Sequence, residues 1–303
     1  AETDGFKPVP FYTVTLELPG FTVAGERMKD KAAAEQLQSA CQSAVATVKQ
    51  VERKDKSEKP PALYDLTTLQ RDANRQLGYT AQQTLDYLQA LYEKKLCTYP
   101  RTDSRYLTAD MEGTVPALAA AAAKICGVAV PDTVLAAQVC NSAKVTDHHA
   151  IVPTEGAGRT DVEALPAGER EILRLVARGL LCATGSPYRY QETAVTLSCG
   201  GNQFSVKGKA ITDPGWKAYQ KEKADPSKES VLPDGLTEGQ TLPVTAVTIK
   251  EGKTTAPKHY TEDTLLSAME TAGAKDMPED AERKGIGTPA TRAGILEKLV
   301  STG

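Results

Sequence analysis

The sequence predicts an α+β protein of several domains, in which a β-rich domain is discontinuous and a helical domain lies between its halves. Strand-like alternation appears near the start of the chain and returns late, whereas the middle of the chain has apolar residues at helical spacing. Such an arrangement needs few connections between the two domains. The expected strands are FYTVTLEL (11–18), ETAVTLSC (192–199), QFSVKG (203–208) and LPVTAVTI (242–249).

Domain boundaries follow from the same patterns and from the length of 303 residues, which suits at least two domains. The charged, proline-terminated run at 52–61 is expected to be a boundary and not an interaction tail. We expect four parts along the chain. They are the first half of the β-rich domain (1–60), the helical domain (61–186), the second half of the β-rich domain (187–256) and a partial helical piece (257–303).

Several helices have recognisable ends. A helix is expected near residues 29–40, while the segment that follows it, with Val45, Val48 and Val51, has no clear pattern. Gly78 should stop one helix and Thr80, with Gln83 three residues later, should cap the next. This pair could be a helix-turn-helix that presents a helix to DNA, or only a packing unit.

Helices are also expected beyond this pair. The alanine run at 119–123 lies in a helical stretch, and alanine is the best helix former. Thr261 should cap a helix that ends near Ala272, and Thr288-Pro289 should open another that ends near Val300.

Composition excludes some functional classes. The 36 basic and 39 acidic residues give a net charge of −3, so a polyanion would need a local basic patch. No apolar window is long enough to span a membrane, and no signal-peptide pattern begins the chain, so a cytoplasmic location is expected. Six cysteines without a C-x-x-C pair and three histidines do not suit a zinc site or a disulfide framework. We expect free thiols and no metal bound by this chain.

The run CTYPRTDSRYL (97–107) carries the densest chemistry. Pro100 keeps Tyr99 out of helical backbone, so Tyr99 and Arg101, two residues apart, can share one face. A nearby guanidinium favours phenolate and neutralises a phosphodiester under attack. Tyr99 is therefore the candidate nucleophile and Arg101 its cation. The alternative is a core aromatic next to an ordinary surface charge.

Two further runs contain candidate site residues. TDHHAIVPTE (146–155) has adjacent histidines that suit proton handling or phosphate contact, with Asp147 or Glu155 to orient a ring. The alternative is a capping aspartate next to surface histidines. KGIGTPATRAG (284–294) sets glycines before a helix N-terminus that can bind phosphate. It lacks P-loop spacing, and a plain capped helix is the alternative.

Together these runs and PPALYDLTTLQRDAN (60–74), in this order, resemble the type IA DNA topoisomerases, most closely the bacterial topoisomerase III branch. The resemblance extends from about residue 9 to the end of the chain, and the Tyr-Pro-Arg-Thr-Asp-Ser run is its most specific part. It implies an arch-shaped fold with the tyrosine in the helical domain. It also implies cleavage and religation of single-stranded DNA through a 5′-phosphotyrosine bond, with strand passage giving relaxation or decatenation.

The resemblance also assigns roles to single residues. Tyr99 would be the nucleophile, and Arg101 and His148 would be the active-site arginine and histidine. The residues expected to contact DNA are Thr102, Ser104, Arg105, His149, Thr288, Thr291 and Arg292.

One part of the family pattern has no counterpart in this sequence. The Toprim domain, which supplies a glutamate and the acidic Mg²⁺ site, is not recognisable, and no D-x-D-x-E run occurs. Mg²⁺ is expected for the full-length enzyme, bound by that domain, and the expected partners are single-stranded DNA and the Toprim domain. We expect a monomer. Without the Toprim domain the chain could also be a non-catalytic single-stranded DNA-binding clamp. A tyrosine recombinase is a third alternative, but its catalytic tyrosine would lie late in the chain, and Tyr99 lies too early for that.

Overall fold

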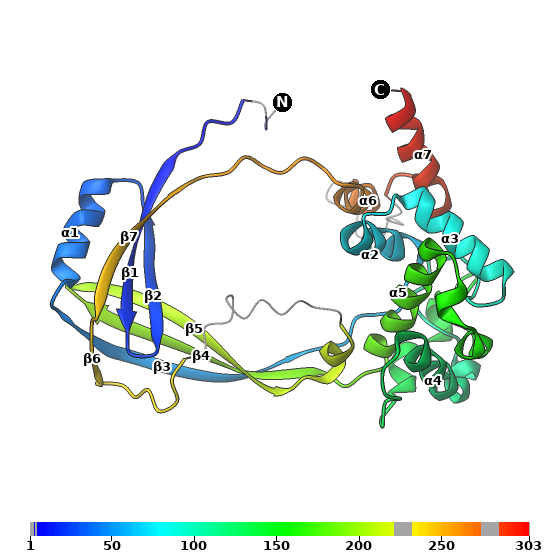
Figure 1. The fold of residues 1–303 in the computed structure, drawn as a ribbon, viewed down its shortest axis with the longest axis horizontal. Helices are drawn as coiled ribbons and strands as arrows, with labels where there is room; N and C mark the ends of the chain where they lie inside the picture. Colours follow the sequence, from blue (N-terminus) through cyan, green and yellow to red (C-terminus); the bar gives the residue numbers. More distant parts are fainter. Residues whose placement is uncertain (1–2, 4, 221–231, 274–284, 303) are drawn as a thin grey trace. The chain divides into compact units, whose positions relative to one another are not determined.

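The computed structural model describes residues 3, 5–220, 232–273 and 285–302. The chain divides into two compact units (Figure 1). The β unit comprises residues 1–58, 189–214 and 222–259, and the helical unit comprises residues 59–188, 215–221 and 260–303. The prediction of a mixed α+β protein is confirmed.

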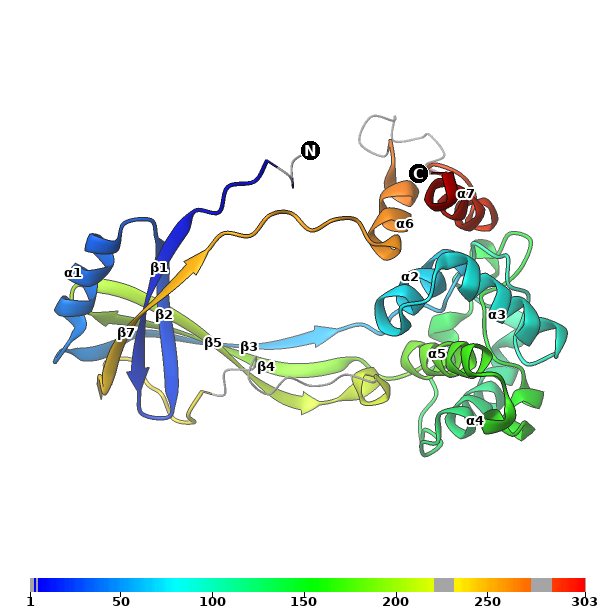
Figure 2. The same ribbon diagram turned by 45° about the horizontal axis from the view of Figure 1, so that its top comes forward.

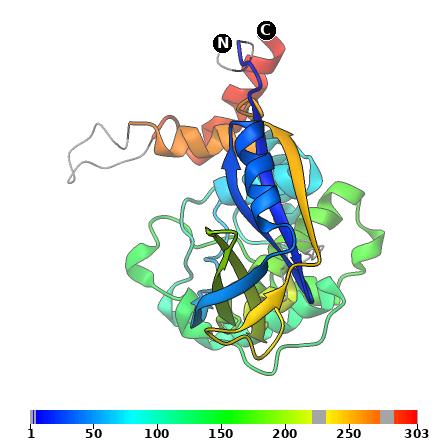
Figure 3. The ribbon, with the colours of Figure 1, turned by 90° about the vertical axis from the view of Figure 1, so that its left-hand side faces the viewer.

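The first sheet of the β unit has three strands in the order β2-β1-β7. Strand β1 (Pro10–Leu18) pairs antiparallel with both β2 (Phe21–Met28) and β7 (Ala246–Lys253). Helix α1 (Lys31–Cys41) packs along this sheet, as Figure 3 shows. The strand expected at 11–18 is confirmed. The partner strand β2 was not predicted.

The second sheet has four strands in the order β5-β4-β3-β6. They are β3 (Val45–Glu58), β4 (Tyr188–Cys199), β5 (Asn202–Asp213) and β6 (Thr241–Pro243). The strands predicted at 192–199 and 203–208 are therefore confirmed. Both sheets supply side chains to one hydrophobic core, which includes Val14, Leu16, Val195, Leu197 and Phe204.

Two expectations for the β unit need correction. The single strand predicted at 242–249 is wrong, because β6 ends at Pro243 and β7 pairs in the other sheet. Proline has no N–H to continue the first ladder. The charged run at 52–61 is more than a boundary, since its residues up to Glu58 extend β3 with mostly exposed side chains. The division between the two units falls directly after this strand.

Four helices form the main core of the helical unit (Figure 2). Helix α2 (Leu66–Leu77) ends at Gly78 in left-handed conformation (φ 74°), and α3 (Ala81–Glu93) begins with a capping box between Thr80 and Gln83, as predicted. The alanine run lies within α4 (Val115–Cys126), where it packs on α5 (Ala167–Ala183).

The last helices of the helical unit are α6 (Glu262–Thr271) and α7 (Pro289–Thr302), which begin where the sequence predicts. They pack on α2 and α3 around a separate small cluster of Ala81, Leu266, Met269, Ala293 and Leu296. Residues 260–303 thus belong to the helical unit in this division. The four-part domain assignment stays a prediction.

Short 3-10 helices connect the larger elements. They are η1 (Ala109–Thr114), η2 (Ala136–Val139), η3 (Ser142–Lys144), η4 (Glu155–Arg159), η5 (Val162–Ala164) and η6 (Gly215–Tyr219). In the part of the chain that the structure describes, no helix combines the length and the apolar character that crossing a bilayer demands.

Candidate active site

The tyrosine run (97–107) and the histidine run (146–155) lie side by side in the helical unit. Thr98 N donates to Val152 O at 3.0 Å, and the Thr98 hydroxyl donates to Ala150 O at 3.1 Å while it accepts from Val152 N at 3.0 Å. Because these bonds involve backbone from both runs, they fix the register between two segments about 50 residues apart.

Two hydroxyls of the tyrosine run reinforce this register. Thr102 Oγ1 donates to His148 O at 2.7 Å and accepts from Ser104 N at 3.0 Å. Ser104 Oγ lies 3.0 Å from Lys144 O and 3.2 Å from Tyr106 O. Thr102 and Ser104 are both buried and bind the backbone of their own chain. Their predicted contact with DNA stays a prediction.

Tyr99 lies between two aromatic rings. The His148 ring centroid is 4.2 Å from that of Tyr99, with an interplanar angle of 36°, and Tyr92 of α3 meets Tyr99 edge-on at 5.5 Å. Tyr99 is half-buried, whereas His148 is exposed. Among the described residues, none forms a hydrogen bond with the Tyr99 hydroxyl. The two aromatic contacts therefore hold the Tyr99 ring in place.

Arg101 is held by the same helix. Its Nη1 donates to Gln89 Oε1 at 3.0 Å, and Gln89 Nε2 donates to Glu93 Oε1 at 2.9 Å. Gln89 and Tyr92 are three residues apart, so they share a face of α3. That face contacts both Tyr99 and Arg101. Sequence reasoning missed Gln89 and Tyr92, because nothing local shows that the chain after α3 returns along the helix.

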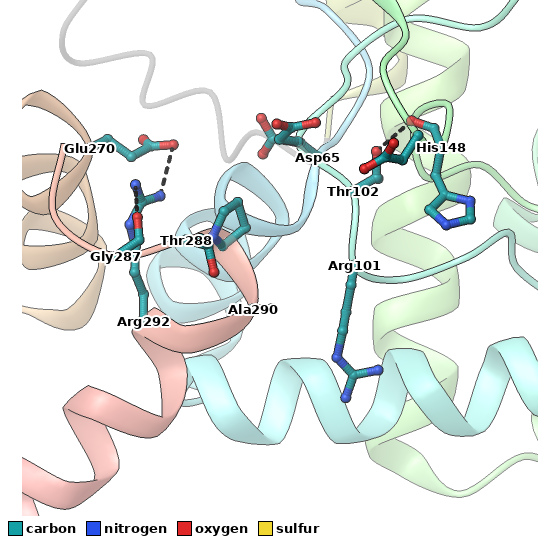
Figure 4. A pocket seen from close by; sticks show the side chains of 12 residues that line it. Asp65, Arg101, Thr102, His148, Glu270, Gly287, Thr288, Ala290 and Arg292 are labelled. Carbon is teal, nitrogen blue, oxygen red and sulfur yellow. Dashed lines mark hydrogen bonds and ion pairs between the residues drawn. The ribbon is translucent and has the colours of Figure 1, made fainter. Parts of the chain in front are cut away.

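A pocket of about 420 Å³, the Arg101 pocket, opens next to these residues (Figure 4). Arg101 extends from its wall toward α3, while Arg292 reaches back from α7 toward Glu270. Four carboxylates line it, and of these only Asp147 was a candidate site residue from the sequence. The lining residues are Asp65, Arg101, Thr102, Asp103, Asp147, His148, Glu270, Gly287, Thr288, Pro289, Ala290 and Arg292.

Two of these acids hold protons more readily than usual. Burial raises the pKa of Asp65 although it caps α2 by accepting from Thr68 N at 2.7 Å. Burial, and then the charge of Asp65, raise the pKa of Glu270 against the opposing effect of Arg292. Across residues 3, 5–220, 232–273 and 285–302, no three His, Cys, Asp or Glu side chains are grouped to hold a metal ion.

The third predicted run reaches the pocket, although its first residue, Lys284, lies outside the described residues. Thr288 and Thr291 bond to each other at the start of α7. Thr288 N donates to Thr291 Oγ1 at 2.9 Å, and the two hydroxyl oxygens lie 3.1 Å apart. Arg292 is only 4% exposed. Its Nε donates to Ile286 O at 3.0 Å and its Nη2 to Gly287 O at 3.1 Å.

Four of the predicted DNA contacts do not line the Arg101 pocket: Ser104, Arg105, His149 and Thr291. Arg105 Nε donates to Leu63 O at 3.0 Å, and its Nη2 lies 3.4 Å from Ala62 O. His149 Nδ1 lies 2.8 Å from Ala150 O. The structure thus brings Arg101, Thr102, His148, Thr288 and Arg292 together around the pocket, with Tyr99 against the His148 ring. Arg105 does not line the pocket, but its charge opposes the rise in pKa that burial gives Asp65 and Glu270, which do line it.

Comparison with known proteins agrees with this fold and motif arrangement. A family model described as DNA topoisomerase matches residues 1–303. DNA topoisomerase 3 of Bacillus licheniformis is 37% identical over 325 residues, which cover 98% of this chain and 44% of that protein. DNA topoisomerase 3 of Bacillus subtilis is 36% identical over 334 residues, covering 100% and 45%.

The chain therefore belongs to the DNA topoisomerase family, and within it is a type IA, topoisomerase III-like chain. Full-length topoisomerase I from Thermotoga maritima shares the fold, with a TM-score of 0.75 at 23% identity over 99% of this chain and 48% of that one. The chain spans slightly less than half the length of these relatives.

Proposed function

We propose that this chain is the tyrosine-bearing part of a type IA topoisomerase that cleaves and reseals single-stranded DNA through a 5′-phosphotyrosine at Tyr99. One observation carries the proposal. The Tyr99 ring contacts the rings of both His148 and Tyr92, and its hydroxyl has no partner among the described residues. Arg101 is hydrogen-bonded to Gln89, which lies on the same face of α3 as Tyr92. That combination suits a nucleophile with a cation for the attacked phosphate.

The chemistry is an exchange of one phosphate ester for another. The Tyr99 hydroxyl gives up its proton as its oxygen attacks phosphorus, the bond from phosphorus to the 3′ oxygen breaks, and a proton is taken up by the departing 3′ oxygen. Resealing reverses these steps. Because the phosphate ester is kept in covalent form, closure needs no nucleotide hydrolysis. The gap allows another strand to pass, which gives relaxation or decatenation.

The residues around Tyr99 have separate roles in this proposal. Arg101 offers a planar guanidinium to two phosphate oxygens, and this contact stabilises charge that develops during transfer. His148 is exposed on the pocket side of Tyr99, so it can donate to a phosphate or handle a proton. Thr102 acts indirectly, since its hydroxyl positions the His148 backbone.

We assign the acid and metal functions to a Toprim domain outside these 303 residues. The protein is proposed to act in the cytoplasm and as a monomer. Mg²⁺ would be bound by the Toprim domain. Two features support the division. The sequence has no D-x-D-x-E run, and the described residues offer no metal cluster.

The proposal is tested by replacing Tyr99 with Phe in a protein that also contains the Toprim domain. Only the phenolic oxygen is lost, so covalent protein–DNA adducts trapped by denaturation should vanish while DNA binding is kept. Persistent adducts would move the nucleophile to another tyrosine.

A conservative change at Arg101 gives a second test. Arg101→Lys replaces a two-pronged contact with a point charge, so cleavage should fall more than affinity does. Equal losses of cleavage and affinity would reduce Arg101 to a DNA-binding residue.

The chain alone tests the division of labour. With Mg²⁺ it should bind single-stranded DNA weakly, with affinity that falls as salt rises, and it should not relax supercoiled plasmid. In that state it acts as the single-stranded DNA-binding clamp. Relaxation only after addition of a separately made Toprim domain supports the split site, and relaxation by the chain alone contradicts it.

A further inference from the structure

The helical unit has a second pocket, the Arg105 pocket, with a volume of about 490 Å³. None of its lining residues lines the Arg101 pocket. The lining residues are Lys59, Pro60, Pro61, Ala62, Leu63, Arg105, Tyr106, Gln138, Val139, Ala183 and Pro187.

Charge distinguishes the two pockets. Four carboxylates line the Arg101 pocket. The Arg105 pocket has two cations in its lining, Lys59 and Arg105, and none of its described lining residues is Asp or Glu. A third cation is adjacent, because Lys144 Nζ lies 4.7 Å from the Tyr106 ring centroid and 3.3 Å from the Tyr106 hydroxyl. The charge of Arg105 also opposes the rise in pKa that burial gives Asp65, which lines the Arg101 pocket, so part of that charge is offset there. The lining of the Arg105 pocket itself carries positive charge only, and this favours an anion.

The walls of the Arg105 pocket are fixed in advance. Two backbone carbonyls, of Leu63 and Ala62, hold the Arg105 guanidinium. Gln138 Nε2 donates to Ala183 O at 2.7 Å and to Gly185 O at 3.0 Å. Groups that are already ordered lose little conformational entropy when a ligand binds.

The remaining lining suits a nucleotide better than a bare anion. Tyr106 is half-buried and supplies an aromatic surface, and three prolines provide rigid apolar walls. Stacking of a base on an aromatic side chain does not depend on base identity. A phosphate near Lys59 and Arg105 and a base near Tyr106 would therefore use both kinds of surface.

We propose that the Arg105 pocket binds one nucleotide of single-stranded DNA, away from the cleavage pocket. The choice of DNA as the ligand rests on the proposed function, whereas the affinity of the pocket for a nucleotide rests on its own residues. Arg105 then contacts DNA as the sequence predicts, but at a second place.

The test uses the full 303-residue chain and an eight-residue oligothymidylate with one thymine replaced by 5-iodouracil, which cross-links to nearby aromatic side chains under light. Peptide mass mapping should find the cross-link at Tyr106. Lys59→Glu, at an exposed position, should lower affinity at low salt at least about fivefold. Lys124→Glu makes the same charge change at an exposed position on α4 and should leave the cross-link in place.

Each outcome decides one point. Absence of the Tyr106 cross-link, or equal effects of Lys59→Glu and Lys124→Glu, overturns the pocket assignment. Competition by thymidine 5′-monophosphate as strong as by the oligonucleotide overturns DNA as the ligand. The two proposals can fail separately. If Tyr106 is cross-linked but no Tyr99 adduct forms when the Toprim domain is added, the pocket assignment stands and the proposed cleavage is rejected.

Discussion

Replacement of Arg292 by Met should loosen the attachment of α7 to the rest of the helical unit. Arg292 is buried, and its guanidinium bonds to two carbonyls of the preceding turn, to Thr67 Oγ1 of α2 at 3.2 Å and, as an ion pair at 3.6 Å, to Glu270 of α6. Methionine keeps the aliphatic stem but removes all of these bonds. The main role of Arg292 would thus be to hold α7 against α2 and α6.

The expected loss follows from these contacts. Removal of one partner of a buried, hydrogen-bonded charge costs roughly 3–5 kcal/mol, because the remaining polar groups are left without partners. Arg75 provides a matched control on α2. Its side chain is 56% exposed and pairs with Asp72 and Asp263. Because solvent screens these ion pairs, Arg75→Met should lower the free energy of unfolding by less than about 1 kcal/mol.

Urea unfolding of both variants measures the free energy of unfolding, and hydrogen exchange locates the change. Arg292→Met should lose amide protection in α6 and α7 before other helices. If its free energy of unfolding falls no more than that of Arg75→Met while DNA affinity drops, the structural explanation is refuted and Arg292 is a phosphate contact.

Three other changes give separable results. Asp65→Asn keeps a capping oxygen but no charge. Because burial raises the folded pKa of Asp65, the wild type should lose more stability than the variant as pH rises from about 4, and a pH-independent gap between their thermal midpoints would contradict this. Gln89→Ala frees Arg101, so adduct formation at saturating DNA should slow about tenfold, and an unchanged rate argues against positioning. Gly158→Ala places a Cβ 2.8 Å from Ala121 Cα and should cost about 1–3 kcal/mol by denaturant unfolding, whereas a neutral change means that the backbone yields.

Local signals in the sequence were sufficient for many element ends. Gly78 in left-handed backbone, the capping boxes at Thr80 and Thr261, and the alternation in β1 all depend on residues within a few positions of each other. Pairing between distant segments was not accessible in the same way. The stretch 242–249 has one alternating pattern, yet its halves join different sheets.

The candidate site shows the same limit. The tyrosine and histidine runs were recognised separately, but their shared register depends on bonds such as that from Thr102 to His148 O. Gln89 lies in an ordinary helical pattern and gains its role only when Arg101 returns to α3. Arg292 was correctly placed at a helix start, but the sequence could not show that its charge is buried against its own chain.

Peptide mapping of a trapped adduct tests the central claim most directly. A single-stranded oligonucleotide is incubated with this chain, a Toprim domain and Mg²⁺, denatured, digested and analysed by mass spectrometry. We predict that the nucleotide remains attached through its 5′ phosphate to Tyr99, with no label on Tyr92 or Tyr106. Attachment at either of those tyrosines, or a 3′-phosphate linkage at Tyr99, would contradict the proposed cleavage chemistry.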